Sequence, residues 1–134
     1  MNASLKKVVV PVLRRLGFKG TFPHFYRDSA GHVDLLTFQF RLGGGSFVVE
    51  LSYAEPGREN VYYDKETQVG KLRVSQTSKR LRLGAKGPGS DNWFSFEPAG
   101  LLKRDADYDR ISASVAGLIE LQALPWWGRN RSPS

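Results

Sequence analysis

The sequence predicts an α+β domain: an antiparallel sheet of about five strands, with an N-terminal and a C-terminal helix packed on one face. Three observations support this fold class. Apolar residues recur at helical spacing near the start, apolar and polar residues alternate through the middle of the chain, and helical spacing returns near the end. A helix, then several antiparallel strands, then a second helix is the order typical of an α+β sandwich.

The first helix is predicted from an apolar stripe. Its members are Leu5, Val8, Val9, Val12, Leu13 and Leu16. Asn2 or Ser4 is suited to cap the start of this helix, and Gly17 is suited to end it. Pro11 lies inside the stripe, where a proline removes one hydrogen bond and costs about 3 kcal/mol. We therefore expect a kink at Pro11 that the packing of the stripe tolerates.

Three strands are expected next, over Thr21 to Asp28, Val33 to Leu42 and Phe47 to Tyr53. In the second and third, one face carries Leu36, Phe38, Phe40, Leu42, Phe47, Val49, Leu51 and Tyr53. The other face carries Thr37, Gln39, Arg41, Val48, Glu50 and Ser52. Alternation of this kind predicts one buried face and one face that is at least partly wet.

The glycines between these two runs limit the pairing of the hairpin. Phe40 opposite Val49 leaves the four-residue loop Gly43 to Ser46, and Phe40 opposite Phe47 leaves the two-residue turn Gly43-Gly44. A slip of one residue would turn every phenylalanine towards water, so both intermediate registers are excluded. Both remaining registers stay open, because glycine tolerates the positive φ angles that either loop needs.

The following segments predict loops and further strands. Ala54 to Asn60 is expected to be a loop, followed by an ambiguous short strand and turn in VYYDKETQVG. RLRL then places Leu81 and Leu83 on one face and Arg80 and Arg82 on the other. GAKGPG is expected to be a hairpin loop, and WFSFE a last strand with Phe94 and Phe96 on one face and Trp93 on the other.

A second helix is predicted near the end of the chain, with Asp105, Asp107 and Asp109 at its start, where negative charges favour a helix N-terminus. Its stripe consists of Tyr108, Ile111, Val115, Leu118, Ile119 and Gln122. Pro125 is expected to end it, and one of Trp126 and Trp127 is expected to close the core. We therefore predict one domain over residues 1–127 and a basic disordered tail over residues 128–134.

Composition narrows the function classes. The chain of 134 residues carries a net charge of +7 and no cysteine, which excludes disulfides, thiolate catalysis and cysteine-ligated metals. No apolar run is long enough to span a membrane, and we read no signal peptide. We expect a cytoplasmic protein. The positive charge favours polyanions or acidic proteins, although solubility alone also explains it.

Catalytic and metal-binding motifs are sparse. His24 and His32, the only histidines, could meet across a strand pair with Asp34, but a third metal ligand is unidentified. GAKGPG lacks the lysine followed by serine or threonine, and the helix, that a phosphate loop requires. We therefore predict no catalytic residue, no metal and no cofactor.

Several segments resemble a known family. VLRRLGFKGTFPHFYRD, VDLLTFQFRLGGGSFVVELSY, RLRLG followed by DNWFSF, and ALPWW are similar to the bacterial domain-of-unknown-function family number 4304, over most of the chain. This chain departs from the family pattern at Arg41, the one basic residue retained after Gln39, and at the glycines that replace more polar turn residues. The resemblance implies the fold and carries no assigned activity. Small families of this kind can act as immunity proteins beside secreted toxins.

The residues predicted to bind a partner lie on the face of the sheet opposite the helices. They are Arg41, Glu50, Arg80, Arg82 and Trp93. Arg80 and Arg82 share one side of a strand, about 7 Å apart. We expect a non-enzymatic domain that binds an acidic protein, with an immunity protein that occludes a bacterial toxin as its leading form. A nucleic-acid-binding domain is the alternative, and an enzyme without a recognisable motif is the third.

Overall fold

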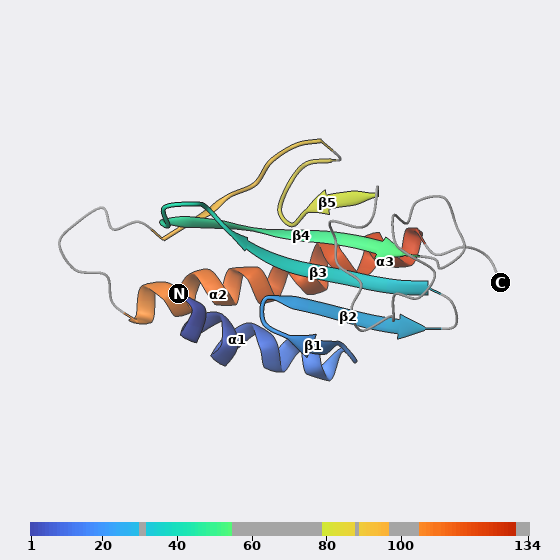
Figure 1. Ribbon diagram of the computed structural model, residues 1–134, viewed down its shortest axis with the longest axis horizontal. Coiled ribbons are helices and arrows are strands. Elements are labelled where there is room, and N and C mark those ends of the chain that lie inside the picture. Colours follow the sequence, from blue (N-terminus) through green and yellow to red (C-terminus); the bar gives the residue numbers. More distant parts are fainter. Residues whose placement is uncertain (30–31, 55–78, 88, 97–104, 131–134) are drawn as a thin grey trace.

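The computed structural model describes residues 1–29, 32–54, 79–87, 89–96 and 105–130 (Figure 1). Its elements are α1 (Asn2–Arg15), β1 (Lys19–Thr21), β2 (His24–Ser29), β3 (His32–Phe40), β4 (Ser46–Ala54), β5 (Arg80–Arg82), β6 (Phe94–Ser95), α2 (Asp105–Leu118), the π-helical turn η3 (Ile119–Ala123) and α3 (Leu124–Arg129). The predicted α+β class is confirmed. The ambiguous strand and turn predicted in VYYDKETQVG lie outside the described residues.

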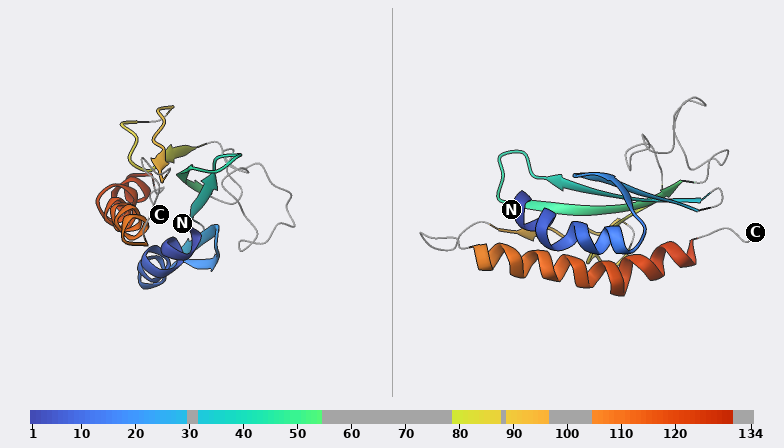
Figure 2. Two further views of the ribbon diagram at one scale, coloured as in Figure 1. Left: turned by 90° about the vertical axis from the view of Figure 1, so that its left-hand side faces the viewer. Right: turned by 90° about the horizontal axis from the view of Figure 1, so that it is seen from below.

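All paired strands are antiparallel, and the main sheet runs in the order β1-β2-β3-β4-β5. Helices α1 and α2 lie together on one face of this sheet (Figure 2). Between the helices and the sheet lies the core, which includes Leu5, Leu13, Phe38, Val49, Leu51, Val115 and Ile119. The predicted arrangement, with both helices on one face, is confirmed.

Helix α1 forms as its apolar stripe predicts, but its start is capped differently. Met1 is the N-cap and makes no side-chain capping bond, so the predicted cap by Asn2 or Ser4 is wrong. Ser4 instead is buried against α2, where its hydroxyl bonds to Asp109 and Ser112. Gly17 follows the end of the helix with a φ of 94°, a conformation that glycine adopts without strain. The tertiary contact with α2 takes precedence over local capping.

The aromatic segment after α1 is a hairpin, where the sequence predicted one strand over Thr21 to Asp28. Strand β1 ends at Thr21, the chain turns through Phe22 and Pro23, and β2 begins at His24. Proline lacks the N–H that a strand interior needs and is at home in a turn. The ring of Phe22 then folds back onto Phe38, with 5.1 Å between the ring centroids.

The central hairpin adopts one of the two predicted registers, with Phe40 opposite Phe47. The Arg41 N–H bonds to the Ser46 carbonyl at 2.9 Å, so the loop comprises residues 42–45 and is longer than the predicted turn. Leu42, predicted on the buried face, is fully exposed at the tip of this loop. Phe40 is only half-buried, because it lies where the hairpin extends towards that exposed tip.

The face of the sheet opposite the helices is not uniformly wet. Val33, Leu35 and Val48 point to that face by their register, and all three are buried. With them, β3 and β4 are buried along most of their length, although both strands also contain polar residues. Gln39 on the same face is exposed. Arg80 on the same face is exposed as well, so the accessible parts of this face include the end near the hairpin loop and the edge at β5.

The edge of the sheet beside β4 is made of two short strands. β5 pairs with Glu50, Leu51 and Ser52, and β6 pairs with Ser46 and Phe47 on the same side of β4. The described residues between them form a loop, as predicted, but it is not a hairpin loop, because in this part of the chain β5 and β6 each pair with β4 and not with one another. Both strands pair with β4 at different points along its length, and the chain between them leaves the edge of the sheet and returns to it.

The C-terminal helix continues through Pro125, where the sequence predicted its end. In the π-helical turn η3, the Leu124 N–H bonds to the Ile119 carbonyl five residues back, and α3 then extends to Arg129. A wide turn accommodates a proline that would clash with a regular helical turn. Trp126 and Trp127 are both buried, and the first two residues of the predicted tail are helical. In the described residues, no helix is long and apolar enough to cross a membrane.

Candidate functional site

Four of the five predicted partner-binding residues come together on the sheet, and one does not. Arg80 faces Glu50 with 3.8 Å between Nη1 and Oε1, and Arg82 is opposite Glu50 in the strand register. The guanidinium of Arg82 lies 5.6 Å from the centre of the Trp93 ring. Asp91, which the sequence did not single out, lies 3.2 Å from Arg82. Glu50, Arg80, Arg82, Asp91 and Trp93 are termed the outer arginine cluster.

Arg41 is not part of this cluster. It follows β3 at the hairpin loop, whereas Glu50 is opposite Thr37, four residues earlier. Four residues of strand correspond to about 13 Å. Distance along the sheet therefore separates Arg41 from Arg80 and Arg82, although the sequence predicted all three on one face.

The loop between β5 and β6 is shaped so that it returns Asp91 and Trp93 to Arg82. Gly84 has a φ of 86°, and a Cβ there would collide with the side chain of Asn92, which bonds to the Leu83 carbonyl at 3.0 Å. Helix α2 and its π-helical continuation also hold this loop, because Gln122 accepts a bond from the Gly84 N–H and donates to the Ala85 carbonyl. Gln122, predicted on the apolar helical stripe, thus holds the start of the loop that carries Asp91 and Trp93.

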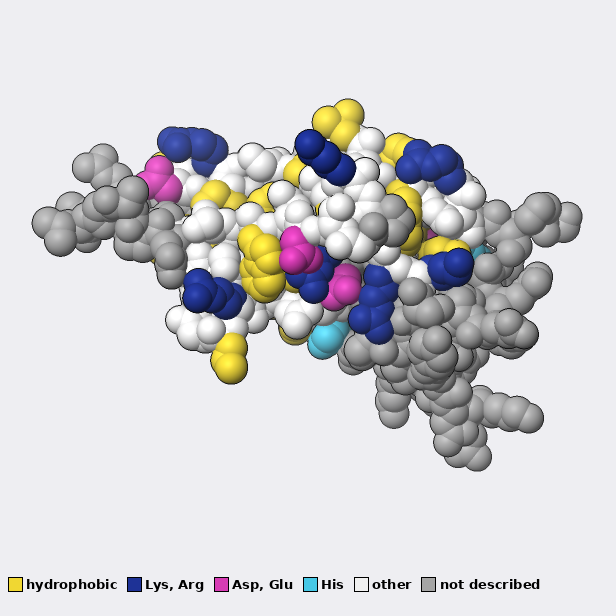
Figure 3. All heavy atoms as spheres, turned by 90° about the horizontal axis from the view of Figure 1, so that it is seen from above, with side chains coloured by type: hydrophobic (Ala, Val, Ile, Leu, Met, Phe, Trp, Pro, Cys, Tyr) yellow, Lys and Arg dark blue, Asp and Glu magenta, His cyan; other side chains and the backbone are white. Residues whose placement is uncertain are grey.

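A shallow hollow of about 220 Å³ lies beside the outer arginine cluster, lined by Glu50, Arg80, Leu81, Arg82, Gly89, Ser90 and Asp91. Figure 3 shows basic and acidic side chains side by side at the centre of this surface, next to hydrophobic ones. Each arginine faces a carboxylate, so the cluster contains as many carboxylates as guanidinium groups. The two arginines therefore add little net positive charge to this surface.

The two histidines do not meet. The Nδ1 atom of His24 lies 3.1 Å from the Thr37 hydroxyl, on the face opposite the helices. His32 lies at the other end of the β2–β3 pair and on the other face, beside Asp34. Among the described residues no three histidine, aspartate or glutamate side chains converge to hold a metal ion. The considered site of both histidines with Asp34 is therefore not formed.

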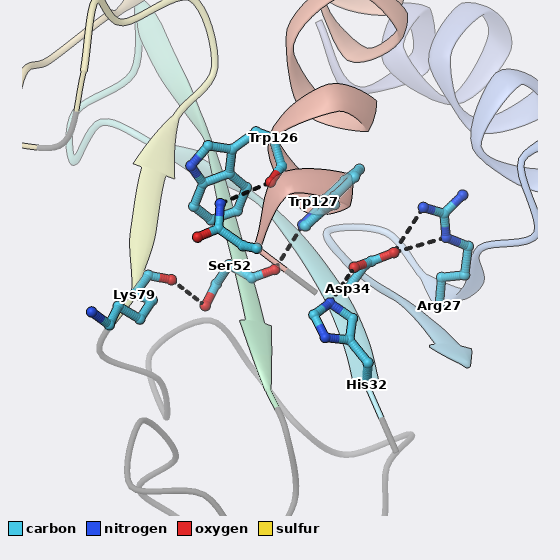
Figure 4. Close-up of polar contacts among 8 residues, drawn as sticks. Arg27, His32, Asp34, Ser52, Lys79, Trp126 and Trp127 are labelled. Carbon is cyan, nitrogen blue, oxygen red and sulfur yellow. Dashed lines mark hydrogen bonds and ion pairs between the residues drawn. The ribbon is translucent and has the colours of Figure 1, made fainter. Parts of the chain in front are cut away.

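A second, buried cluster is centred on Asp34, opposite Arg27 in the β2–β3 register (Figure 4). Arg27 donates from Nε at 2.9 Å and from Nη2 at 2.7 Å to one carboxylate oxygen of Asp34. The Nε2 atom of His32 lies 3.0 Å from the other oxygen. A carboxylate accepts hydrogen bonds, so Nε2 is the donor in this contact. Asp34 is fully buried between Arg27 and His32.

The guanidinium of Arg27 also joins this cluster to the core. It lies 4.9 Å from the centre of the Phe18 ring and 5.8 Å from that of Trp127, and it donates to the Leu16 carbonyl. Trp127 in turn donates from its indole nitrogen to the Ser52 carbonyl at 2.8 Å. Arg27, His32, Asp34 and Trp127 are termed the inner arginine cluster. It links α1, the sheet and α3.

The inner cluster is arranged to hold the fold. His32 stacks on Tyr53 at 5.4 Å, and its side chain is only 8% exposed. A carboxylate behind an imidazole is also found in general bases, but a base needs access to a substrate proton. Asp34 is already neutralised by Arg27, and its partner His32 lies under the surface. Sequence inspection missed this cluster because only the β2–β3 register places Arg27 opposite Asp34.

A third polar contact joins α1 and α2. Lys7 donates to Asp109 at 2.6 Å, and the Ser4 hydroxyl donates to the other oxygen of the same carboxylate at 2.6 Å. The hydrogen bond from Lys7, followed by that from Ser4, holds the pKa of Asp109 below the ordinary aspartate value of 3.8. Asp109 was predicted only as a favourable charge at the helix start. It also connects the two helices that cover the sheet.

Comparison with known families supports the resemblance noted in the sequence. Curated proteins and solved structures yield no match. The model of the family described as "Domain of unknown function (DUF4304)" matches residues 9–129, which is most of the chain. The matched region extends from within α1 to the end of α3 and contains both arginine clusters. The chain therefore belongs to the DUF4304 family.

Proposed function

We propose that this chain is a non-enzymatic protein-binding domain and that the outer arginine cluster anchors an acidic partner. The observation that carries this proposal is Trp93, which is 44% exposed and lies under the guanidinium of Arg82. Tryptophan and arginine are the residues most enriched among the few that dominate protein interfaces. The adjoining hollow offers a concave surface next to this pair.

The ion pair between Arg82 and Asp91 indicates that a partner would have to supply a carboxylate. Arg82 is 27% exposed, whereas Asp91 is 69% exposed and so is easily displaced. A carboxylate of the partner could replace Asp91 on the planar guanidinium, which favours two-point contacts. The net charge of +7 would speed encounter with an acidic surface. In this proposal the outer arginine cluster makes the specific contacts, and the net positive charge of the whole chain provides the long-range electrostatic attraction.

The most concrete form of this function is an immunity protein of the bacterial cytoplasm that covers a toxin and blocks it by occlusion. Its support is the expectation for small families of this kind, together with an exposed anchor residue on a sheet. Occlusion needs only tight binding and no chemistry, which suits a chain in which the sequence shows no catalytic motif.

The test is quantitative co-purification from the native cell with mass spectrometry, using the wild-type chain and three variants as bait. Trp93→Ala and the double variant Arg80→Glu/Arg82→Glu should lose the partner about 10-fold or more. Leu121→Ala, which removes another exposed apolar side chain on the π-helical turn, should retain it. Equal recovery with all baits would contradict the proposal.

A purified partner allows a kinetic test of the charges. Arg80→Glu/Arg82→Glu should slow association several-fold, and the loss should shrink as salt rises, because salt screens long-range attraction. Loss of the captured material after nuclease treatment would instead favour the nucleic-acid alternative. So would steeply salt-dependent binding to generic RNA, because counterion release dominates such contacts.

A further inference from the structure

The positive charge of the chain is concentrated at its N-terminal end. The first 27 residues contain no acidic residue and six basic ones: Lys6, Lys7, Arg14, Arg15, Lys19 and Arg27. Two of these are matched elsewhere, Lys7 by Asp109 and Arg27 by Asp34. In the described part of the chain the other four have no carboxylate within ion-pair distance. Helix α1 and β1 therefore form a surface with uncompensated positive charge, unlike the outer arginine cluster.

An apolar groove lies on this basic surface. A hollow of about 370 Å³ is lined by Lys6, Val10, Arg14, Thr21 and Phe22, and is termed the corner groove. The first three residues are four apart on α1, so they form one ridge with a cation at each end. Eight residues of helix span about 12 Å. Thr21 and Phe22, from the end of β1 and the turn after it, form the opposite wall.

The cationic side chains of the groove are held by backbone carbonyls and an aromatic ring, not by carboxylates. Arg14 donates to the Phe18 carbonyl at 3.2 Å and to the Gly20 carbonyl at 2.6 Å, so its guanidinium is fixed in place. The Lys6 ammonium lies 5.6 Å from the centre of the Phe22 ring. Phe22 stacks on Phe38 and cannot swing away freely. Positioned donors of this kind reduce the conformational entropy lost on binding.

We propose that the corner groove binds a segment of an acidic protein in which one apolar side chain is flanked by carboxylates two residues away on either side. In an extended chain the two carboxylates of such a segment are four residues apart, about 13 Å, which matches the ridge between Lys6 and Arg14. The apolar side chain would cover Val10 and Phe22. This surface is separate from the outer arginine cluster, so either proposal can fail alone.

Other modes of binding fit this groove less well. Addition of a strand to β1 is disfavoured, because Arg14 already occupies the Gly20 carbonyl of this three-residue strand. Stacking of a nucleic-acid base needs an open aromatic face, whereas Phe22 is half-buried against Phe38. A side chain of a protein is the occupant whose size and charge both match.

The test uses a labelled synthetic peptide, Gly-Glu-Ser-Phe-Ser-Glu-Gly, whose glutamates flank a central phenylalanine at the proposed spacing. Two matched peptides replace either the phenylalanine by serine or both glutamates by glutamine. Loss of the aromatic side chain should weaken binding about 10-fold or more. Amide resonances of Val10, Thr21 and Phe22 should shift in NMR spectra, whereas the indole resonance of Trp93 should not.

Two variants of α1 form the matched protein pair. Lys6→Gln should weaken binding of the peptide about 3- to 10-fold, because it removes a cation at the groove. Arg15→Gln removes the same charge one residue beyond Arg14, outside the groove lining, and should change binding less than about 2-fold. Circular dichroism should show both variants folded, since the side chains are exposed.

Three outcomes would overturn the proposal. The first is no shift of the groove resonances at about 1 mM peptide. The second is equal binding of the serine-substituted peptide, which would leave only non-specific attraction. The third is tighter, Lys6-dependent binding of a single-stranded oligonucleotide or of anionic vesicles than of the peptide, which would assign the basic surface to another class of partner.

Discussion

The molecule contains the same three chemical groups twice, once inside and once outside. Arg27 bonds to Asp34 at 2.7 Å and lies 5.8 Å from the Trp127 ring. Arg82 lies 3.2 Å from Asp91 and 5.6 Å from the Trp93 ring. In the inner cluster the carboxylate and the indole are fully buried, whereas in the outer cluster they are 69% and 44% exposed.

Burial is what separates the roles of the two clusters. Exposed ion pairs contribute from about zero to 1 kcal/mol, because water and salt screen them. Removal of one partner from a buried pair costs about 3–5 kcal/mol, because the remaining charge stays desolvated. The inner cluster can therefore hold the fold. The ion pairs of the outer cluster contribute little to stability, which is what the proposed exchange of Asp91 for a partner carboxylate requires.

The largest contrast is expected from one substitution made in both clusters. Asp34→Asn should lower the free energy of unfolding by about 3 kcal/mol, since the amide removes the negative charge beside Arg27 and keeps only one of the two oxygens that accept from Arg27 and His32. Asp91→Asn should change it by less than about 0.5 kcal/mol. Urea unfolding followed by circular dichroism measures both. Similar losses in the two variants would remove the distinction between the clusters.

The two tryptophans give the second contrast. Trp127→Phe should cost about 2–3 kcal/mol, because it leaves a cavity and deprives the Ser52 carbonyl of its donor. Trp93→Phe should cost less than about 0.5 kcal/mol. Thermal unfolding of the two variants checks this order. A more costly change at Trp93 would mean that it supports the edge of the sheet.

Replacement of arginine by lysine gives a third contrast between the inner and the outer cluster. Lysine keeps the charge but loses the planar fork that bonds a carboxylate and stacks on rings. Arg27→Lys should therefore cost about 1–2 kcal/mol, and Arg82→Lys should be close to neutral for stability. Chemical unfolding curves of the two single variants provide the measurement. Equal stability of both would show that charge alone matters in the inner cluster.

The smallest effect is expected at Asp109. Its side chain is 34% exposed, which is more than Asp34 of the inner cluster and less than Asp91 of the outer cluster. Its pKa in the folded chain is lowered by the hydrogen bonds from Lys7 and Ser4. The stabilisation is therefore complete above the ordinary value of 3.8 and is lost as pH falls below it, through the lower folded pKa. Asp109→Asn should lose stability at neutral pH and show a shallower decline in acid. Parallel pH curves for variant and wild type would contradict this role.

Much of the fold could be predicted from periodicity. Alternation placed Phe38, Val49 and Leu51 on the buried face, and helical spacing placed Val115 and Ile119 against them. These predictions succeed because each residue's burial follows from its own position in a repeating pattern. Periodicity also placed Arg80 and Arg82 on the face opposite the helices.

The remainder depends on contacts between distant segments. The ion pair of Arg27 with Asp34 requires the β2–β3 register, and that of Arg82 with Asp91 requires a loop held by Gln122. The helix through Pro125 requires a π-helical turn that no local pattern announces. The sequence therefore predicted the strands or loops that carry the charged side chains, but it did not predict which of these side chains form ion pairs.

The interrupted edge beside β4 has a consequence for solubility. A long uncovered strand is a template on which other chains can pair and aggregate. Here β5 and β6 are short, and the chain between them leaves the edge and returns with Asp91 and Trp93. The same excursion thus blunts the edge against indiscriminate strand pairing and presents the side chains of the outer cluster. The same segment that limits strand pairing at this edge therefore also carries the side chains on which the proposed function depends.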